Sequence, residues 1–133
     1  MKKGYKGNLE ELTLANENFR KVIYTAKNCQ LVLMSLAPGE DIGLETHEGG
    51  DQFFRFEMGS GEVVINETKY TVSAGDAVIV PMGAMHNVVN TSQTEKLKLY
   101  TLYTPPHHED GVVRLTKADT LNNSPEWSGK TTE

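Results

Sequence analysis

Short apolar segments separated by turn residues most limit how this chain can fold. Eight such segments of three to seven residues recur along it, rich in Val, Ile, Phe, Tyr and Thr, which fit a pleated surface. Gly, Pro, Asn and Asp lie between them, as tight turns require. Many short strands at this spacing predict an all-β sandwich or barrel. The predicted strands are residues 21–25, 30–36, 52–57, 62–65, 69–72, 77–80, 87–89 and 98–103.

The chain of 133 residues is predicted to form one domain. A helical apolar period is visible only over residues 8–22, so we allow one short helix near the N-terminus. We divide the chain into an N-terminal segment (1–20), a β-domain (21–116) and a polar C-terminal tail (117–133).

Charge and cysteine content exclude several classes of function. The chain has 13 Lys and Arg against 18 Asp and Glu, without a basic cluster, which argues against binding nucleic acid. It has neither an apolar run long enough to span a membrane nor a signal-peptide pattern. The single Cys29 excludes an internal disulfide and favours a reducing compartment. We therefore expect a soluble, cytoplasmic protein. Its partner is then expected to be a small-molecule ligand or substrate, as the candidate site described next suggests.

Four side chains have the spacing and chemistry of a metal site. Glu45 and His47 are two residues apart, so on a strand they share one face. Gln52 begins the next predicted strand, and His86 follows a Pro-Met-Gly-Ala-Met turn. Imidazole and oxygen ligands of this kind suit Mn²⁺, Fe²⁺, Zn²⁺ or Ni²⁺. Taken singly, each side chain is equally compatible with an ordinary structural role.

Aromatic residues near this set are candidates for the lining of a pocket. Phe54 and Phe56 alternate with Gln52 along one strand, and Tyr103 ends the last long strand. Met85 precedes His86 and is a candidate for a flexible rim. The alternative is that these side chains simply belong to the core.

Two further histidines follow the last predicted strand. His107 and His108 come after a Pro-Pro turn, which could fold back over one mouth of the barrel. There, either imidazole could serve as an acid or a base near neutral pH. The alternative is that both are exposed loop residues.

The arrangement of these residues resembles the cupin superfamily, in particular its small single-domain microbial members. The first cupin motif is matched by Gly39, Glu45-Thr46-His47, Gln52 and Gly59, with two ligand positions substituted. The second motif is matched without exception. Its residues here are Gly75, Pro81, Gly83, His86 and Asn90.

The resemblance implies a jelly-roll β-barrel, often a homodimer, with one divalent transition metal inside. Carried over by position, the ligands are Glu45 and His47 for the two His of the first motif, Gln52 for its Glu, and His86. Glu45 keeps one negative charge in the ligand set, but at a different position from the family's usual carboxylate. The neutral amide of Gln52 is a weaker ligand than a carboxylate.

Three functions are compatible with such a site. The first is a metal-dependent enzyme acting on a small polar organic molecule by oxygenase or by isomerase or lyase chemistry. The second is a binding or sensing module whose metal is structural or vestigial. The third is a barrel without metal, in which Glu45 hydrogen-bonds His86. No Lys or Arg lies where it would clearly hold a phosphate inside the barrel, which argues against a sugar phosphate.

Overall fold

The computed structural model describes residues 1–121 and 124–133 and confirms the all-β prediction. Helix α1 (Leu9–Ala15) precedes the strands, as the sequence allowed, and a 3-10 turn, η1 (Lys117–Thr120), follows them. The strands are β1 (Arg20–Thr25), β2 (Gln30–Leu36), β3 (Glu45–Thr46), β4 (Asp51–Met58), β5 (Ser60–Ile65), β6 (Thr68–Ser73), β7 (Ala77–Val80), β8 (Met85–Asn90), β9 (Leu97–Thr104) and β10 (Val113–Arg114).

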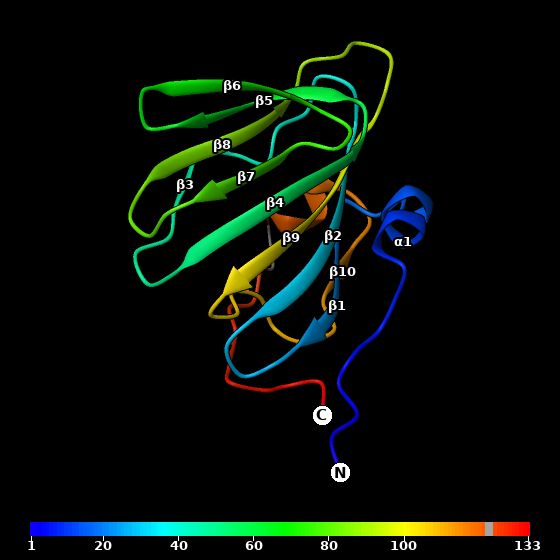
Figure 1. Cartoon of the computed structure of the whole chain (residues 1–133), viewed down its shortest axis with the longest axis vertical. Helices are drawn as coiled ribbons and strands as arrows, with labels where there is room; N and C mark the ends of the chain where they lie inside the picture. Colours follow the sequence, from blue (N-terminus) through cyan, green and yellow to red (C-terminus); the bar gives the residue numbers. More distant parts are fainter. Residues whose placement is uncertain (122–123) are drawn as a thin grey trace.

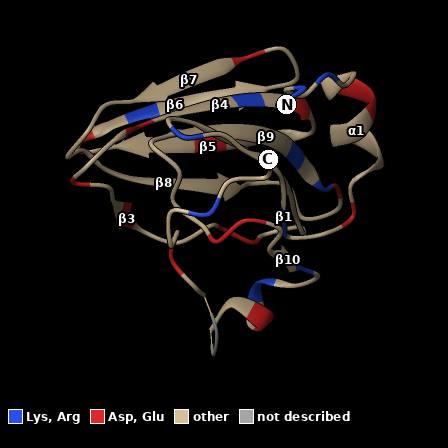
Figure 2. Ribbon diagram, turned by 90° about the horizontal axis from the view of Figure 1, so that it is seen from below, with Lys and Arg blue, Asp and Glu red and all other residues tan. Residues whose placement is uncertain are grey.

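The strands form two antiparallel sheets that face each other (Figure 1). One sheet has the order β10-β1-β2-β9-β4-β7, and the other has the order β3-β8-β5-β6. The 3-10 turn η1 lies outside both sheets, next to β10 (Figure 2). No helix among the described residues is both long and apolar enough to cross a membrane.

Each of the eight predicted strands lies within an observed one. Strands β3 and β10 were not among them, because two residues are too few to show an alternating pattern. In β4 the alternation is clear: Gln52, Phe54 and Phe56 are buried, whereas the residues between them are half-buried. The inner face of β4 therefore carries both core side chains and a predicted metal ligand.

The core fills the space between the sheets. Phe54 and Phe56 of β4 pack there with Leu99 of β9, Val63 of β5 and Val88 of β8, all essentially inaccessible to solvent. Burying each such side chain contributes about 1.5–3 kcal/mol to the free energy of unfolding. The core gives the strands that carry the candidate ligands a rigid support.

Two of the motif glycines lie where the backbone conformation favours glycine. Gly59, between β4 and β5, has a φ of +89°, and a Cβ there would lie 2.4 Å from the carbonyl oxygen of Lys96. Gly83 has a φ of +85° in the turn before β8, and its amide donates to the carbonyl of His47 at 2.9 Å. That bond fixes the turn that leads to His86 against the segment that carries His47.

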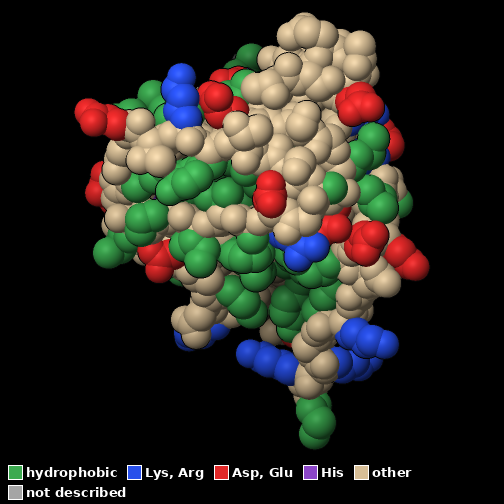
Figure 3. Space-filling view, turned by 45° about the horizontal axis from the view of Figure 1, so that its top comes forward, with side chains coloured by type: hydrophobic (Ala, Val, Ile, Leu, Met, Phe, Trp, Pro, Cys, Tyr) green, Lys and Arg blue, Asp and Glu red, His purple; other side chains and the backbone are tan. Residues whose placement is uncertain are grey.

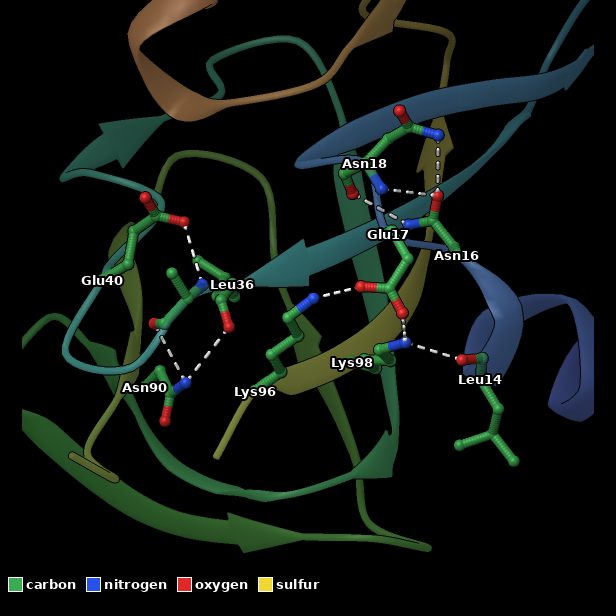
Figure 4. Close-up of polar contacts among 10 residues, drawn as sticks. Leu14, Asn16, Glu17, Asn18, Leu36, Glu40, Asn90, Lys96 and Lys98 are labelled. Carbon is green, nitrogen blue, oxygen red and sulfur yellow. Dashed lines mark hydrogen bonds and ion pairs between the residues drawn. The ribbon is translucent and has the colours of Figure 1, made fainter. Parts of the chain in front are cut away.

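The buried side chain of Asn90 holds two loops together where β8 ends (Figure 4). The Asn90 amide group donates to the carbonyls of Leu36 and Ala37, the two bonds drawn in Figure 4. It also donates to the carbonyl of Glu95, and its Oδ1 accepts from the amide of Ser92. In this way one side chain joins β8 to the end of β2 and to the loop before β9.

A second polar group holds α1 against β9. The buried Lys98 Nζ donates to the Leu14 carbonyl at 2.6 Å and to the Glu17 carboxylate at 2.8 Å (Figure 4). Lys96 forms a further ion pair with Glu17. These two ion pairs hold the pKa of the Glu17 carboxyl down at about 2.

The end of the C-terminal tail is bonded to the domain. Glu133 accepts from the amides of Lys3 and Gly4, so the two termini lie at the same end of the molecule (Figure 1). Nearer the barrel, the amide of Trp127 donates to the carbonyl of His107, and the amide of Glu109 donates to the carbonyl of Pro125. The tail therefore lies alongside the segment that carries the two consecutive histidines.

Candidate metal centre

Strand pairing brings the first two candidate ligands together. Glu45 of β3 is the direct partner of His86 of β8, so their side chains share one face of the sheet. His47 follows two residues after Glu45. One ligand atom from each of these three side chains lies within 4.8 Å of the others. We call these three residues the Glu45–His47–His86 cluster. Figure 2 shows β3 with its acidic residue beside β8.

A backbone hydrogen bond sets the protonation of His86. Its Nδ1 lies 3.2 Å from the carbonyl oxygen of Ala84. Since a carbonyl only accepts, Nδ1 carries the proton and Nε2 is left with a free lone pair. Burial lowers the pKa of the His86 ring, although the Ala84 carbonyl partly opposes this. The ring is thus kept in the neutral form that binds metals.

Glu45 contacts His47 rather than His86. Its Oε2 lies 3.0 Å from His47 Nε2. Burial raises the pKa of the Glu45 carboxyl, but the His47 ring and then the charge of Arg20 outweigh it and hold that pKa below its usual value. Glu45 is therefore a carboxylate at neutral pH, and the sequence-based alternative of a Glu45–His86 hydrogen bond is wrong.

Gln52 is buried at the start of β4, on the opposite sheet. Its Nε2 donates to Thr101 Oγ1 at 3.0 Å, which fixes the orientation of the side-chain amide. Its Oε1 is buried and has no hydrogen-bond partner among the described residues. An amide oxygen in this situation is available as a weak metal ligand.

His107 lies against the cluster, His108 lies behind it against Tyr103, and neither is an exposed loop residue. The His107 ring is 4.4 Å from the His47 ring, centroid to centroid, and it also stacks on Tyr103. His108 is buried and its Nε2 lies 3.2 Å from the Tyr103 hydroxyl. Burial lowers the pKa of His108 to about 2, so this ring stays neutral. The segment after β9 does fold back over this end of the barrel.

Gln30 holds that segment in place. This fully buried side chain of β2 accepts from the amides of His107 and His108 through Oε1, and it donates to the His108 carbonyl at 2.7 Å through Nε2. We did not single out Gln30 from the sequence, where it reads only as the first residue of a strand. A polar residue at an inward position of a core strand was the available signal.

Two open cavities reach the cluster from either side of His107. The first, of about 250 Å³, is lined by His47, Asp51, Tyr103 and His107, among others. The second, which we call the Arg20 cavity, has a volume of about 230 Å³. Its lining residues are Arg20, Ile42, Glu45, His107, His108, Thr120, Ser124, Pro125 and Glu126.

Arg20 is a basic side chain in the wall of a cavity, although the sequence showed no Lys or Arg that would clearly hold a phosphate inside the barrel. It is only 6% exposed, at the first position of β1. Val22, two residues on, is buried in the core. Arginine on the inward face of a strand is uncommon, and this alternation was the missed sequence signal.

The remaining predicted pocket residues occupy different places. Tyr103 is buried and lines the first cavity. Phe54 lies in the core, with its ring centroid 6.3 Å from that of His86, and Phe56 lies deeper beside it. Met85 is exposed, on the opposite side of β8 from the buried His86.

Comparison with known proteins identifies the family of this chain. Residues 32–103 match the family model described as "Cupin domain". The uncharacterized protein YrkC of Bacillus subtilis is 45% identical over 120 residues, which are 86% of this chain and 64% of YrkC. The oxalate-binding protein of Thermotoga maritima is 32% identical over 62 residues, which are 47% of this chain and 51% of that protein. Both relatives thus extend well beyond the region they share with this chain.

Among solved structures, BH2720 from Bacillus halodurans is similar over most of its length. The two chains are 38% identical, with a TM-score of 0.88, and the match covers 91% of this chain and 96% of that one.

Proposed function

This chain belongs to the cupin family, and we propose that it is a metal-dependent enzyme that acts on a small polar organic molecule. The observation that carries the proposal is the convergence of Glu45, His47 and His86, with donor atoms within 4.8 Å of one another, at a place that two cavities reach. A purely structural metal would be enclosed by protein on all sides, whereas this cluster has approaches for a second molecule.

The donor set fits a divalent transition metal. Metal–ligand bonds of about 2.0–2.2 Å place neighbouring donor atoms about 3–4 Å apart. The cluster therefore needs only small side-chain movements to bind an ion. Gln52, with its unpartnered Oε1, is the proposed fourth and weaker ligand. Two imidazoles favour Mn²⁺, Fe²⁺, Zn²⁺ or Ni²⁺ over Ca²⁺.

A metal bound there would supply Lewis acidity toward a carbonyl or hydroxyl group, or, as iron, access to oxygenase chemistry. The chain's own residues hold and orient the substrate. His107 lies between the two cavities, so its ring is placed to hydrogen-bond a molecule in either one. Gln30 keeps that ring in position by bonding the backbone on which it is carried. Tyr103 supplies an apolar wall against which part of the substrate can pack.

The ligand types are shared by two reaction classes. Two His and one carboxylate form the facial set that suits oxygenases. The mixed Gln, Glu, His and His set equally suits an isomerase or lyase, in which the metal polarises a carbonyl. We propose these as the two reaction classes to test.

A non-catalytic binding protein is the second candidate function. It is favoured by the similarity to a relative that is named for binding oxalate, although that similarity covers only 47% of this chain. The neutral amide of Gln52 also supports this alternative, because it weakens the ligand set.

The openness of the loaded site separates a metal centre that can bind a second molecule from a closed structural one. We would load the full chain with Mn²⁺ and measure the relaxation rate of water protons. A site built for substrate keeps exchangeable water, so bound Mn²⁺ should enhance relaxation strongly. Adding a small polar organic molecule that displaces this water should reduce the enhancement. Bound Mn²⁺ that gives no enhancement would indicate a closed structural site and contradict the enzyme proposal.

Gln52→Glu tests the proposed fourth ligand. The added carboxylate should tighten Mn²⁺ binding by about tenfold or more, since a charged oxygen ligand replaces a neutral one. In the metal-free protein the same substitution should lower the melting temperature, because it buries an uncompensated charge. Gln52→Met, of similar size, is the control and should weaken binding. Equal affinities in all three proteins, measured by competition with a chelator, would remove Gln52 from the ligand set.

We also propose a homodimer in a reducing compartment, the cytoplasm. The thiol of Cys29 is free, which is compatible with such a compartment. Tyr70 of β6 and Ile79 of β7 are exposed apolar residues that line one shallow hollow. Hydrophobic side chains gather on the side of the molecule seen in Figure 3. An apolar surface of this kind is suited to contact with a second copy.

A further inference from the structure

Arg20 is a buried charge whose side chain has no hydrogen-bond or ion-pair partner among the described residues. Its side chain is 6% exposed, and its Nε is buried without a hydrogen bond. The guanidinium carbon lies 5.4 Å from the centroid of the Phe19 ring. No hydrogen bond or ion pair joins it to another residue of 1–121 or 124–133. A buried guanidinium is unfavourable unless something pairs with it, so its presence needs an explanation.

The Arg20 cavity explains the buried guanidinium, because it connects Arg20 to the candidate metal centre. Glu45, a member of the cluster, lines the same cavity of about 230 Å³. The positive charge of Arg20 also acts on the neighbouring groups, since it contributes to lowering the pKa values of Glu45, His107 and His108. A molecule in the cavity therefore contacts Arg20 at one end and approaches the cluster at the other.

We propose that Arg20 binds the carboxylate of a small organic anion whose other end reaches the Glu45–His47–His86 cluster. The inference rests on the proposed metal-dependent function and names its class of substrate. The planar guanidinium matches the two oxygens of a carboxylate, which it holds by two parallel hydrogen bonds. Partial burial of the pair strengthens it, because water competes less for the donors.

The other polar groups of the cavity favour a carboxylate over a phosphate. The Thr120 hydroxyl already donates to the Lys117 carbonyl, and the Ser124 hydroxyl donates to the Thr120 carbonyl. The His108 ring nitrogen is engaged with the Tyr103 hydroxyl. Apart from Arg20, the rings of His107 and His108 are the described lining side chains that could still offer a polar hydrogen, and each neutral imidazole carries a single N–H. A phosphate dianion usually recruits more donors than a guanidinium and these N–H groups provide.

The acidic groups of the cavity make anion binding depend on metal. Glu45 and Glu126 line the cavity beside Arg20, and without metal they oppose an incoming carboxylate. Glu126 is exposed, so solvent screens its charge. A divalent ion bound to the cluster would neutralise the negative charge of Glu45. We therefore expect the anion to bind the metal-loaded chain and not the metal-free chain.

The test is calorimetric titration of the Mn²⁺-loaded full chain with malonate, succinate and glutarate. The best-bound dicarboxylate should lose at least tenfold in affinity in Arg20→Gln, and less in Arg20→Lys, which keeps the charge but not the planar fork. The corresponding diamide, which is neutral, should bind the wild type and Arg20→Gln alike. Arg55→Gln is the matched control, because Arg55 pairs with Glu57 on β4 and does not line the cavity.

Stability separates this role from a structural one. Without any anion, Arg20→Gln should melt at the same temperature as the wild type or higher, since it removes an unpartnered buried charge. Adding the dicarboxylate should raise the melting temperature of the wild type and not that of Arg20→Gln. A lower melting temperature in Arg20→Gln without anion would overturn the proposal, because it would show that Arg20 supports the fold. A lower melting temperature in Arg20→Lys without anion would have the same meaning.

Two further outcomes would overturn the inference. Equal dicarboxylate affinities in the wild type and Arg20→Gln, with Mn²⁺ content unchanged, would refute the role of Arg20 and leave the metal proposal intact. Inorganic phosphate that binds more tightly than any dicarboxylate, with the same dependence on Arg20, would refute the carboxylate assignment. Failure of the wild type to take up Mn²⁺ would show instead that the proposed function is wrong, and the inference would fall with it.

Discussion

His47→Ala is expected to lose its metal while keeping its fold. His47 supplies one of the three converging donor atoms, so its removal leaves Glu45, His86 and the weaker amide of Gln52 to hold the ion. Loss of a partner that merely orients a ligand typically costs 10–100-fold in metal affinity, so loss of a ligand itself should cost more than about 100-fold. His47 is only half-buried and lines an open cavity, so water can replace its ring without a large cost in stability.

His107→Ala is the matched control for that result. His107 packs against His47 at 4.4 Å between ring centroids, yet it is not a member of the cluster. Its removal should leave the metal stoichiometry unchanged, as measured by elemental analysis after gel filtration. Equal metal loss in both variants would mean that the whole group of histidines, rather than the Glu45–His47–His86 cluster, holds the ion.

Asn90→Ala is expected to give the largest loss of stability. The side chain is 1% exposed, and it donates to three carbonyls that have to be satisfied where β2 ends and β9 begins. At about 1 kcal/mol net for each bond, plus the cost of leaving buried carbonyls unpaired, the free energy of unfolding should fall by about 2–4 kcal/mol. Urea denaturation followed by circular dichroism would measure it.

Neighbouring substitutions identify the cause of that loss. Thr91→Ala, at the adjacent exposed position, should change the stability by less than about 0.5 kcal/mol. Asn90→Asp keeps the shape of the side chain but replaces its donor NH2 group with a carboxylate oxygen, which only accepts and faces the same carbonyl oxygens. At neutral pH it should therefore destabilise the fold at least as much as Asn90→Ala. If Asn90→Asp were as stable as the wild type, the account of Asn90 as a donor to three loops would be wrong.

Much of the fold could be predicted because its determinants are local. Alternation marks each long strand, and the turn residues between them need special backbone angles, as at Gly59 and Gly83. The same logic brought out the candidate ligands: residues two apart share a strand face, so Glu45 and His47 were expected together. Their proximity to His86 followed from family resemblance, and the β3–β8 pairing supplies its physical cause.

The rest of the site depends on contacts between residues distant in the sequence. That His107 lies over His47 requires Gln30, more than 70 residues earlier, to bond its backbone. Sequence spacing cannot show such a bond. The burial of Arg20 likewise depends on the tail, since Ser124, Pro125 and Glu126 close the cavity around it. These tertiary contacts also bury His108, which lowers the pKa of its ring.

We propose above all that the Glu45–His47–His86 cluster binds one divalent transition metal. The most direct measurement is the metal content of the full chain, purified without chelator or affinity metal and analysed for Mn, Fe, Ni and Zn. We predict close to one equivalent of one of these metals per chain, and background levels in His47→Ala. Background levels in both proteins, even after incubation with each metal in turn, would contradict the account.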